Sequence, residues 1–361
     1  MNQTPRFAVV CQTIITNQIM KTYLVTGASG YIASWIVKFL LEKGEKVHGT
    51  VRSLKNADKI SHLLDLQKKY PEQLFLFEAD LLHKESFRPA MKGCDIILHT
   101  ASPFMISKIK DSNRDLIQPA KEGTHNVLTV ANEFPEVKKI VVTSSVAAIY
   151  SDAADIRSAK NNVFTEEIWN TTSSEKYNPY QYSKTVAERE AWKIANEQKQ
   201  WKLATINPGF VMGPSLSKRV DSTSVDMMRS LINGKYKSGV PDLYFGVVDV
   251  RDVAKAHILA ATKESAIGRH ICVSATLPLL EMAKILREKY PNLPIPKSVA
   301  PKFILYLAGP LMGFPWKFIN LNVGIPFAFD NSKSLGIGLI YTPIKDTLID
   351  HVKQLLEDGL V

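Results

Sequence analysis

The sequence predicts an α/β protein with a doubly wound parallel sheet and a smaller C-terminal lobe. Short apolar runs alternate with helix-like segments between residues 21 and 145. These runs are rich in Val, Ile and Leu without clean alternation, which is typical of strands covered on both faces. The repeated strand–helix order favours a parallel sheet. A length of 361 residues exceeds what one core usually organises, and this favours two lobes.

The expected elements follow in order along the chain. Strands are predicted at residues 21–26, 46–51, 74–79, 95–100, 139–143, 203–207 and 269–274. Helices are predicted at residues 31–43, 57–69, 113–133, 180–198 and 249–262. The first helix stops at Gly44, which is a typical C-terminal cap. Residues 209–245 are rich in Gly, Ser and Pro and predict loops with one helix.

The same pattern suggests where the domains begin and end. Residues 1–20 are expected to be a dispensable tail, because polar residues break their apolar run and Met20 stands just before the first strand. Residues 21–208 and 246–275 are predicted to form the sheet domain. Residues 209–245 and 276–361 are predicted to form the smaller lobe.

Composition narrows the class of protein. Hydrophobic residues make up 45% and charged residues 22% of the chain, a balance typical of soluble globular proteins. The three cysteines are scattered without metal-ligand spacing, which favours a reducing cytoplasm and predicts no metal site. The net charge of +10 comes from dispersed Lys and Arg, which predicts a diffuse basic surface rather than a nucleic-acid site. The sequence contains no run of about 18 apolar residues, so no membrane span is predicted.

A glycine-rich loop follows the first strand directly and opens the first helix. It reads Gly27-Ala-Ser29-Gly30-Tyr31-Ile32-Ala33. A tight turn at Gly27 and a bare backbone at Gly30 let a pyrophosphate approach the helix N-terminus, and a small Ala33 permits close helix–sheet packing. The strand–turn–helix context therefore predicts a dinucleotide site. Its loop contacts are expected to come from Gly27, Ser29, Gly30, Tyr31 and Ile32.

The end of the second strand indicates which dinucleotide binds. An Asp or Glu is expected there when the ribose 2′-hydroxyl is recognised. This chain has Arg52 instead, with Lys59 further on, and Arg52 can pair with a 2′-phosphate in a bidentate manner. The alternative is an exposed arginine at a helix entry. We predict NADP(H) as the cofactor.

Two further strand ends are expected to complete the nucleotide site. Asp80 and Leu81 follow the third strand, where an acidic side chain can reach the adenine amino group. Small residues follow the fourth strand and leave room for the ribose and phosphates; they are Thr100, Ala101 and Ser102.

A tyrosine and a lysine four residues apart predict the chemistry. Tyr180 and Lys184 begin a helix, so that this spacing puts both side chains on one face. An ammonium beside a phenol is expected to lower the pKa of the phenol toward neutrality, and such a tyrosine can protonate a carbonyl oxygen as hydride arrives at carbon. Ser145, in a Thr-Ser-Ser sequence that ends the fifth strand, can donate a hydrogen bond to the same oxygen.

These motifs together resemble the extended short-chain dehydrogenase/reductase superfamily, whose cofactor domain is a Rossmann fold. The closest similarity is to the dihydroflavonol reductase and cinnamoyl-CoA reductase branch, over residues 21–275, and the C-terminal DNSK sequence at 330–333 resembles microbial aldehyde reductases in it. The motifs that carry the resemblance are VTGASGYIASW at 25–35, TVR at 50–52, ADL at 79–81, GCD at 93–95, HTASP at 99–103 and SKTVAE at 183–188.

The resemblance implies specific roles. Ser145 would hold the carbonyl, Tyr180 would donate the proton, and Lys184 would lower the pKa of Tyr180. Pro208, after the sixth strand, would lie against the nicotinamide. Asn126 matches a position assigned to a proton-relay water, although a side-chain amide bonded to backbone is an equal alternative. The sheet domain would bind NADP and the smaller lobe would bind the substrate.

The sequence departs from the plant flavonoid reductases at one position. Their substrate-contacting asparagine would fall at Tyr150, which cannot offer an amide's paired donor and acceptor. This disfavours dihydroflavonols and favours a smaller or more apolar aldehyde or ketone. An aromatic set between residues 303 and 329 fits either an apolar pocket or a packed lobe core; it consists of Phe303, Tyr306, Phe314, Trp316, Phe318 and Phe327.

Three functions are compatible with these observations. The first is an NADPH-dependent carbonyl reductase, as a monomer or homodimer acting on a small-molecule aldehyde or ketone. The second is a nucleotide-sugar epimerase or dehydratase with bound NAD, which Arg52 disfavours. The third is a non-catalytic NADP sensor, which has no need of a proton donor such as Tyr180.

Overall fold

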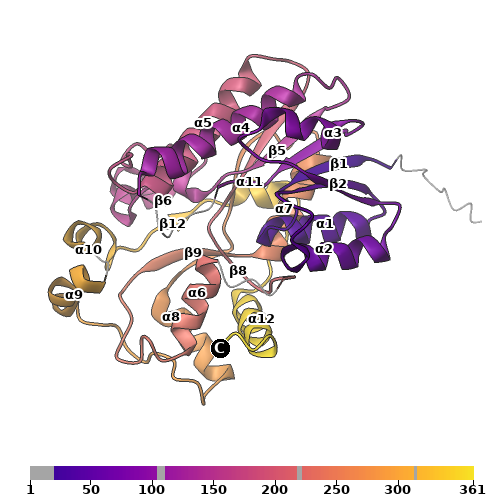
Figure 1. Cartoon of the computed structure of the whole chain (residues 1–361). Helices are drawn as coiled ribbons and strands as arrows, with labels where there is room; N and C mark the ends of the chain where they lie inside the picture. The colour runs from indigo at the N-terminus through magenta and orange to yellow at the C-terminus, as the bar shows by residue number, and fades with distance from the viewer. Residues whose placement is uncertain (1–19, 104–109, 218–221, 313–314) are drawn as a thin grey trace, which may run out of the picture.

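The chain forms a central parallel sheet whose two faces are covered by helices (Figure 1). The structure, a computed structural model, describes residues 20–103, 110–217, 222–312 and 315–361. In this part of the chain the large sheet has seven strands, all parallel. From one edge to the other they are β10 (Gly268–Cys272), β7 (Lys202–Pro208), β5 (Lys139–Thr143), β4 (Ile96–His99), β1 (Thr22–Thr26), β2 (Lys46–Val51) and β3 (Leu74–Glu78).

The two helical layers explain the apolar strands. One layer contains α1 (Tyr31–Glu42), α2 (Ala57–Lys69) and α7 (Val250–Thr262), and the other contains α3 (Arg88–Met91), α4 (Gln118–Ala131) and α5 (Pro179–Asn196). Adjacent strand residues point to opposite faces. In β1, Tyr23 and Val25 pack into the first core, and Leu24 packs into the second. Both faces are buried, so the strand shows no polar alternation.

The doubly wound fold predicted from the sequence is confirmed. All the predicted strands are present, with ends within two residues of the expected ones. The helix expected at 113–133 begins as a π-helical turn, Asn113–Ile117, before α4. Pro119 lies in the first turn of α4 and has no N–H to bond back to the preceding π-helical turn.

A second, smaller sheet packs beside the large one, with the strand order β11-β9-β8. Its strands are β8 (Phe210–Met212), β9 (Tyr244–Asp249) and β11 (Ala275–Pro278). Its apolar face is covered by α6 (Thr223–Ile232), α8 (Leu279–Lys289) and α12 (Ile344–Glu357). The sequence predicted the helix at 223–232 as part of its loop region but missed all three strands, β8, β9 and β11. β8 is only three residues long, and Gly209 looks like a turn signal; its role is instead close packing, since a Cβ there would lie 2.1 Å from the carbonyl oxygen of Gly246.

An aromatic cluster joins a third, two-stranded sheet to the loop after β5. β6 (Val163–Phe164) pairs with β12 (Ala328–Phe329). Tyr150 stacks on Phe164 with 4.7 Å between ring centroids, and Phe327 lies 5.3 Å from Tyr150. Phe327 therefore belongs to a core, which is one of the two alternatives predicted for the aromatic set.

The rest of the aromatic set divides between core and surface. Tyr306 and Phe318 pack partly buried on a small cluster formed by α9 (Lys302–Ala308) and α10 (Trp316–Asn322). Phe303 and Trp316 are 65% and 63% exposed, so they line neither a pocket nor a core. Phe314 lies outside the described residues.

The chain returns to the large sheet near its C-terminal end. α11 (Ser332–Gly336) contacts β10, and Ile337 and Leu339 join the core beneath α1 and α7. α12 then crosses back to the smaller sheet (Figure 1). The segment after β12 thus contributes to both lobes, although the sequence assigned it to the smaller one. Within the described residues, no helix is long and apolar enough to cross a bilayer.

Candidate active site

The glycine loop has the backbone that its sequence predicts. Gly27 has φ +65°, a left-handed value that favours glycine, and a Cβ there would also press on Ala101 at 3.1 Å. Gly30 is the N-cap residue of α1, where no side chain of the described residues bonds to the free N–H groups, and a Cβ on it would lie 3.1 Å from the Gly27 carbonyl oxygen. Ala33 is 1% exposed against the sheet. The first turn of α1 carries no acidic residue, so its N-terminus keeps a positive potential for an anion.

The hydroxyl of Thr26 connects the first and fourth strand ends. It accepts hydrogen bonds from the backbone N–H groups of Thr100 and Ala101, both at 3.1 Å. The hydroxyl proton then points to Nδ1 of His99 at 2.8 Å. Burial, reinforced by the charge of Lys184, lowers the pKa of His99 to about 3, so this ring is neutral and able to accept. The loop and the Thr100-Ala101-Ser102 segment are therefore held together as one surface.

The helix after the glycine loop is also tied to the smaller lobe. Tyr31 donates its hydroxyl proton to the carbonyl of Gly213, and Trp35 Nε1 donates to the carbonyl of Pro214 at 2.9 Å. The Gly213 N–H in turn donates to Nδ1 of His351 in α12 at 3.2 Å. Burial lowers the pKa of His351 to about 4, which keeps the ring neutral and able to accept. The side chain of Tyr31 thus bonds to protein, and its predicted contact with the cofactor stays a prediction.

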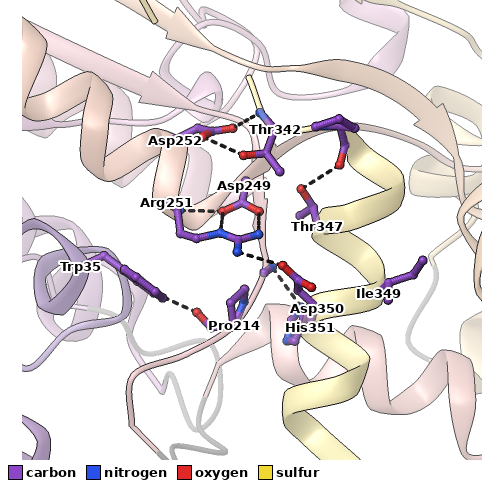
Figure 2. A network of polar contacts seen from close by, with 12 residues as sticks. Trp35, Pro214, Asp249, Arg251, Asp252, Thr342, Thr347, Ile349, Asp350 and His351 are labelled. Atoms are coloured by element: carbon purple, nitrogen blue, oxygen red, sulfur yellow. Dashed lines mark hydrogen bonds and ion pairs between the residues drawn. The ribbon is translucent and has the colours of Figure 1, made fainter. Parts of the chain in front are cut away.

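An ion-pair network continues this connection between the lobes (Figure 2). Arg251, at the start of α7, forms a two-pronged pair with Asp249 at 2.9 and 2.7 Å and a further pair with Asp350 of α12 at 2.8 Å. The next residue, Asp252, accepts from the backbone N–H of Thr342 at 2.5 Å and from its hydroxyl at 3.0 Å. These bonds join the end of β9, the start of α7 and the C-terminal segment that contains α12.

The predicted phosphate and adenine residues lie around the same strand edge. Arg52 and Lys59 are exposed, at the exit of β2 and on the first turn of α2. Within the described residues, no ion pair engages either side chain. Asp80 accepts from the N–H of Leu82 at 2.9 Å, and Leu81 packs against Gly123 of α4. The exposed side chains of Arg52 and Lys59 are therefore available to a phosphate.

The three predicted catalytic residues lie near the carboxyl edge of the sheet, on or beside two segments that contact each other: α5 and the 3₁₀ turn Val146–Ala148 after β5. Tyr180 and Lys184 lie in the first two turns of α5, with Lys184 Nζ 5.8 Å from the centroid of the Tyr180 ring. Lys184 Nζ also donates to Ser102 Oγ at 3.0 Å. Ser145 follows β5 and caps a short 3₁₀ turn, accepting from the Ala147 N–H at 3.1 Å. A serine hydroxyl that accepts there still has its proton to donate.

The pKa values differ from the expectation for Tyr180. Burial raises the pKa of Tyr180 to about 12 and lowers the pKa of Lys184 to about 8. The expectation of a near-neutral tyrosine is therefore wrong for the chain by itself, because burial opposes charge on both groups more strongly than Lys184 favours a phenolate. Tyr180 is protonated at neutral pH, the form a proton donor requires.

Two residues implied by the family resemblance have clear places. The amide of Asn126 donates to the Leu81 carbonyl at 2.8 Å, which is the backbone-bonded alternative. Pro208 ends β7 and is buried opposite Cys272 of β10. A cavity of about 10 Å³, room for a single water, lies behind Lys184 and is lined in part by Ser102, Thr143 and Glu188.

Sequence reasoning missed a buried polar cluster beneath these residues. Glu188 of α5 is 1% exposed and pairs with Arg269 of β10 at 2.7 Å. Asn207 of β7 donates to the same carboxylate at 2.8 Å. One signal was present: Glu188 follows Lys184 by four residues and so shares its helix face. Nothing in the sequence indicated Arg269 as its partner.

The position of Tyr150 is decided by packing. Its ring is held between Phe164 and Phe327 rather than extended alone into solvent. Burial raises the pKa of its phenol well above the ordinary value, and Asp152 adds to that effect. Tyr150 therefore packs on an aromatic core, at the position where the plant flavonoid reductases have an amide.

Comparison with known proteins identifies the family. The model of the NAD dependent epimerase/dehydratase family matches residues 23–274. The chain belongs to this family. It is 39% identical to cinnamoyl-CoA reductase CAD2 of Medicago truncatula over 336 residues, which span 92% of this chain and 95% of that protein.

Solved structures of the family superimpose on the whole fold. Yeast methylglyoxal/isovaleraldehyde reductase Gre2, complexed with NADPH, has a TM-score of 0.77 and 31% identity, covering 94% of this chain and 100% of that chain. Gre2 of Candida albicans in complex with NADPH has a TM-score of 0.77 and 32% identity, covering 94% and 99%. The resemblance to the reductase branch is thus confirmed along nearly the full chain.

Proposed function

We propose that this member of the epimerase/dehydratase family is an NADPH-dependent carbonyl reductase. The observation that carries the proposal is the contact between α5, the helix of Tyr180 and Lys184, and the turn that Ser145 caps, at the strand edge where Lys184 also bonds to Ser102. Ligands of open α/β sheets bind at this edge. The relatives support the reaction class, since the Medicago truncatula protein and yeast Gre2 are both named reductases and the two Gre2 structures are complexed with NADPH.

The residues at the loop fit a dinucleotide. Gly27 and Gly30 leave a cradle that a Cβ would fill, and the open N-terminus of α1 lies behind it. Ser29, Tyr31 and Ile32 would hold the pyrophosphate through backbone N–H groups beside the bare Cα of Gly30, whose own N–H donates to the Gly27 carbonyl at 2.8 Å. Arg52 and Lys59 would hold the 2′-phosphate. Asp80 and Leu81 would flank the adenine, and Thr100, Ala101, Ser102 and Pro208 would line the ribose and nicotinamide.

The chain's own residues account for the proton and the orientation of the substrate. Bound NADPH supplies a hydride to the carbonyl carbon. Ser145 donates a hydrogen bond that fixes the carbonyl oxygen, and Tyr180 delivers its hydroxyl proton to that oxygen as negative charge develops there. Lys184, held by Ser102, stabilises the tyrosinate left behind. The product is the corresponding alcohol.

We propose an aldehyde or ketone with an apolar substituent as the substrate. Tyr150, five residues after Ser145, packs its ring in an aromatic core with Phe164 and Phe327 and adds no amide to the site. A dihydroflavonol would lack the amide partner that Tyr150 replaces. The alternative of a nucleotide-sugar epimerase using NAD remains less favoured, because Arg52 stands where an acidic residue would bind a ribose hydroxyl.

A direct assay tests the function. Purified protein is expected to consume NADPH, followed at the nicotinamide absorbance band, when given aldehydes such as methylglyoxal or phenylacetaldehyde. A UDP-sugar with bound NAD serves as the comparison for epimerase activity. Failure to oxidise NADPH across a broad panel of aldehydes and ketones would contradict the proposal, as would turnover of the nucleotide sugar alone.

The rate of reduction is expected to fall as the pH rises through about 8. Lys184, with its pKa lowered to about 8 by burial, carries its charge below that pH and loses it above. Tyr180, with a pKa of about 12, stays protonated throughout this range. The value of kcat/KM should therefore be flat below pH 8 and decline about tenfold per unit well above it. NADPH affinity, measured at each pH by fluorescence, separates loss of binding from loss of chemistry; a kcat/KM that rises above pH 8 would contradict the assignment.

A further inference from the structure

The catalytic helix is joined to three strand ends by one buried carboxylate. Glu188 lies on the same face of α5 as Tyr180 and Lys184, one turn further along. Its two oxygens accept from Ser144 Oγ at 2.5 Å, Asn207 Nδ2 at 2.8 Å, Thr205 Oγ1 at 3.0 Å, Trp192 Nε1 at 3.3 Å, and Arg269 Nε and Nη2 at 2.7 and 3.3 Å. These donors come from the end of β5, from β7, from β10 and from α5 itself.

We infer that Glu188 is a positioning residue that fixes Ser145 relative to Tyr180 and Lys184. The inference rests on the proposed function, in which these three residues share one carbonyl oxygen. Ser145 lies on a loop after β5, whereas the tyrosine and lysine lie on α5. A hydrogen bond that orders these two elements with respect to each other therefore orders the reacting groups.

Two contacts carry the position of Ser145 to the carboxylate. Its neighbour Ser144 donates a hydroxyl proton to Glu188, and the Ser144 N–H donates to the carbonyl of Ile206 at 2.8 Å. The carbonyl of Ser145 accepts from Asn207 Nδ2 at 3.2 Å, the same amide group that donates to Glu188. Both the backbone of Ser145 and the side chain beside it are thus set by Glu188.

Arg269 holds the carboxylate and extends its reach to the next loop. Its guanidinium donates to Glu188 through Nε and Nη2, to the Ala148 carbonyl at 3.2 Å, and to the Glu166 carbonyl at 2.8 Å. The ring of Trp169 lies 4.0 Å from the guanidinium carbon. Ala148 belongs to the short 3₁₀ turn that Ser145 caps. The arginine thereby ties this turn to the same centre from its other end.

The energetics favour a positional role over simple stabilisation. Glu188 and Arg269 are 1% and 6% exposed, so both charges have lost most of their hydration. A buried ion pair is weak evidence for stability, because apolar residues of similar volume often stabilise a core equally well. A fully bonded carboxylate instead fixes the relative positions and orientations of its donor groups, because each donor must meet a particular oxygen. Catalysis depends on the relative positions of the reacting groups, since a displacement of about 1 Å can cost about 100-fold in rate.

Two single-bond variants test the inference on the full-length protein. Ser144→Ala removes the bond toward Ser145, and Trp192→Phe removes a bond to the same carboxylate from the side away from Ser145. We expect Ser144→Ala to lower kcat about tenfold with the NADPH dissociation constant unchanged. Trp192→Phe should keep kcat within about twofold of the parent. Equal effects of the two substitutions would overturn the inference.

An isotope effect separates positioning from partial unfolding. Loss of folded protein lowers the active fraction but leaves the deuterium isotope effect of 4-deuterated NADPH unchanged. A displaced Ser145 slows the chemical step itself, so the single-turnover rate of hydride transfer should fall in Ser144→Ala and further in Glu188→Gln, and the isotope effect on kcat should rise wherever product release limits the parent. NADPH-binding stoichiometry reports the folded fraction of each variant. A single-turnover rate per bound NADPH equal to that of the parent in Ser144→Ala would overturn the inference even if Glu188→Gln fails to fold. Absence of turnover in the parent would instead contradict the proposed function.

Discussion

Replacing Tyr180 by phenylalanine is expected to lower kcat by about 10²–10⁴-fold while NADPH still binds. The phenol proton is the only one that the proposed reaction delivers directly to the carbonyl oxygen. Phenylalanine keeps the ring, so the packing at the start of α5 and the position of Lys184 should persist. The measurement is single-turnover reduction of an aldehyde with NADPH bound, together with NADPH titration by fluorescence.

The control for this substitution lies on the same helix. Tyr182→Phe removes an identical hydroxyl two residues further on, where the helical turn directs the side chain to another face. It should leave kcat within about twofold of the parent, because nothing in the proposed chemistry uses it. If Tyr180→Phe kept a tenth or more of the parent rate, another group would have to supply the proton.

Converting Arg52 to aspartate is expected to invert the cofactor preference. A charge-assisted bidentate pair with the 2′-phosphate is worth about 1.5–3 kcal/mol, or about 10–150-fold in affinity. Aspartate removes this pair, repels the phosphate and offers a carboxylate to the 2′-hydroxyl of NADH. The ratio of kcat/KM for NADPH to that for NADH should therefore fall by at least about 100-fold.

A matched change elsewhere on α2 tests whether the effect is local. Lys68→Asp makes the same change in charge near the far end of the helix, where Lys68 pairs with Asp65 on the exposed surface. It should change the cofactor ratio by less than about twofold, because solvent and salt screen exposed charges at that range. An unchanged ratio in Arg52→Asp would mean that another cation, with Lys59 the first candidate, recognises the phosphate.

The large sheet could be predicted from the sequence because its determinants are local. Each strand is a short apolar run between polar or glycine residues, and burial on both faces makes the run continuous. The glycine loop is equally local, since Gly27 must adopt a positive φ and Gly30 must remain bare. Tyr180 and Lys184 were found for the same reason, as a helical repeat fixes their common face.

The features that escaped prediction depend on contacts between distant residues. Glu188 and Arg269 are far apart in the chain, and only the fold shows that they pair. The pKa of Tyr180 depends on how deeply α5 buries its first turn, which no local pattern reveals. Tyr150 could be identified as an unusual residue at its position, but its aromatic partners Phe164 and Phe327 come from two other segments.

The return of the chain to the large sheet has a consequence for how the protein acquires its structure during synthesis. Ile337 and Leu339 share a core with Tyr23 and Val25, so residues from opposite ends of the chain seal the same layer. Domains usually fold as units as they leave the ribosome, N-terminal first. Here the core of the nucleotide-binding half cannot be completed until almost the whole chain has left the ribosome, and part of its apolar face stays uncovered until then. Contacts of such long sequence separation also slow folding, which lengthens the period in which this half is open to aggregation or chaperone binding.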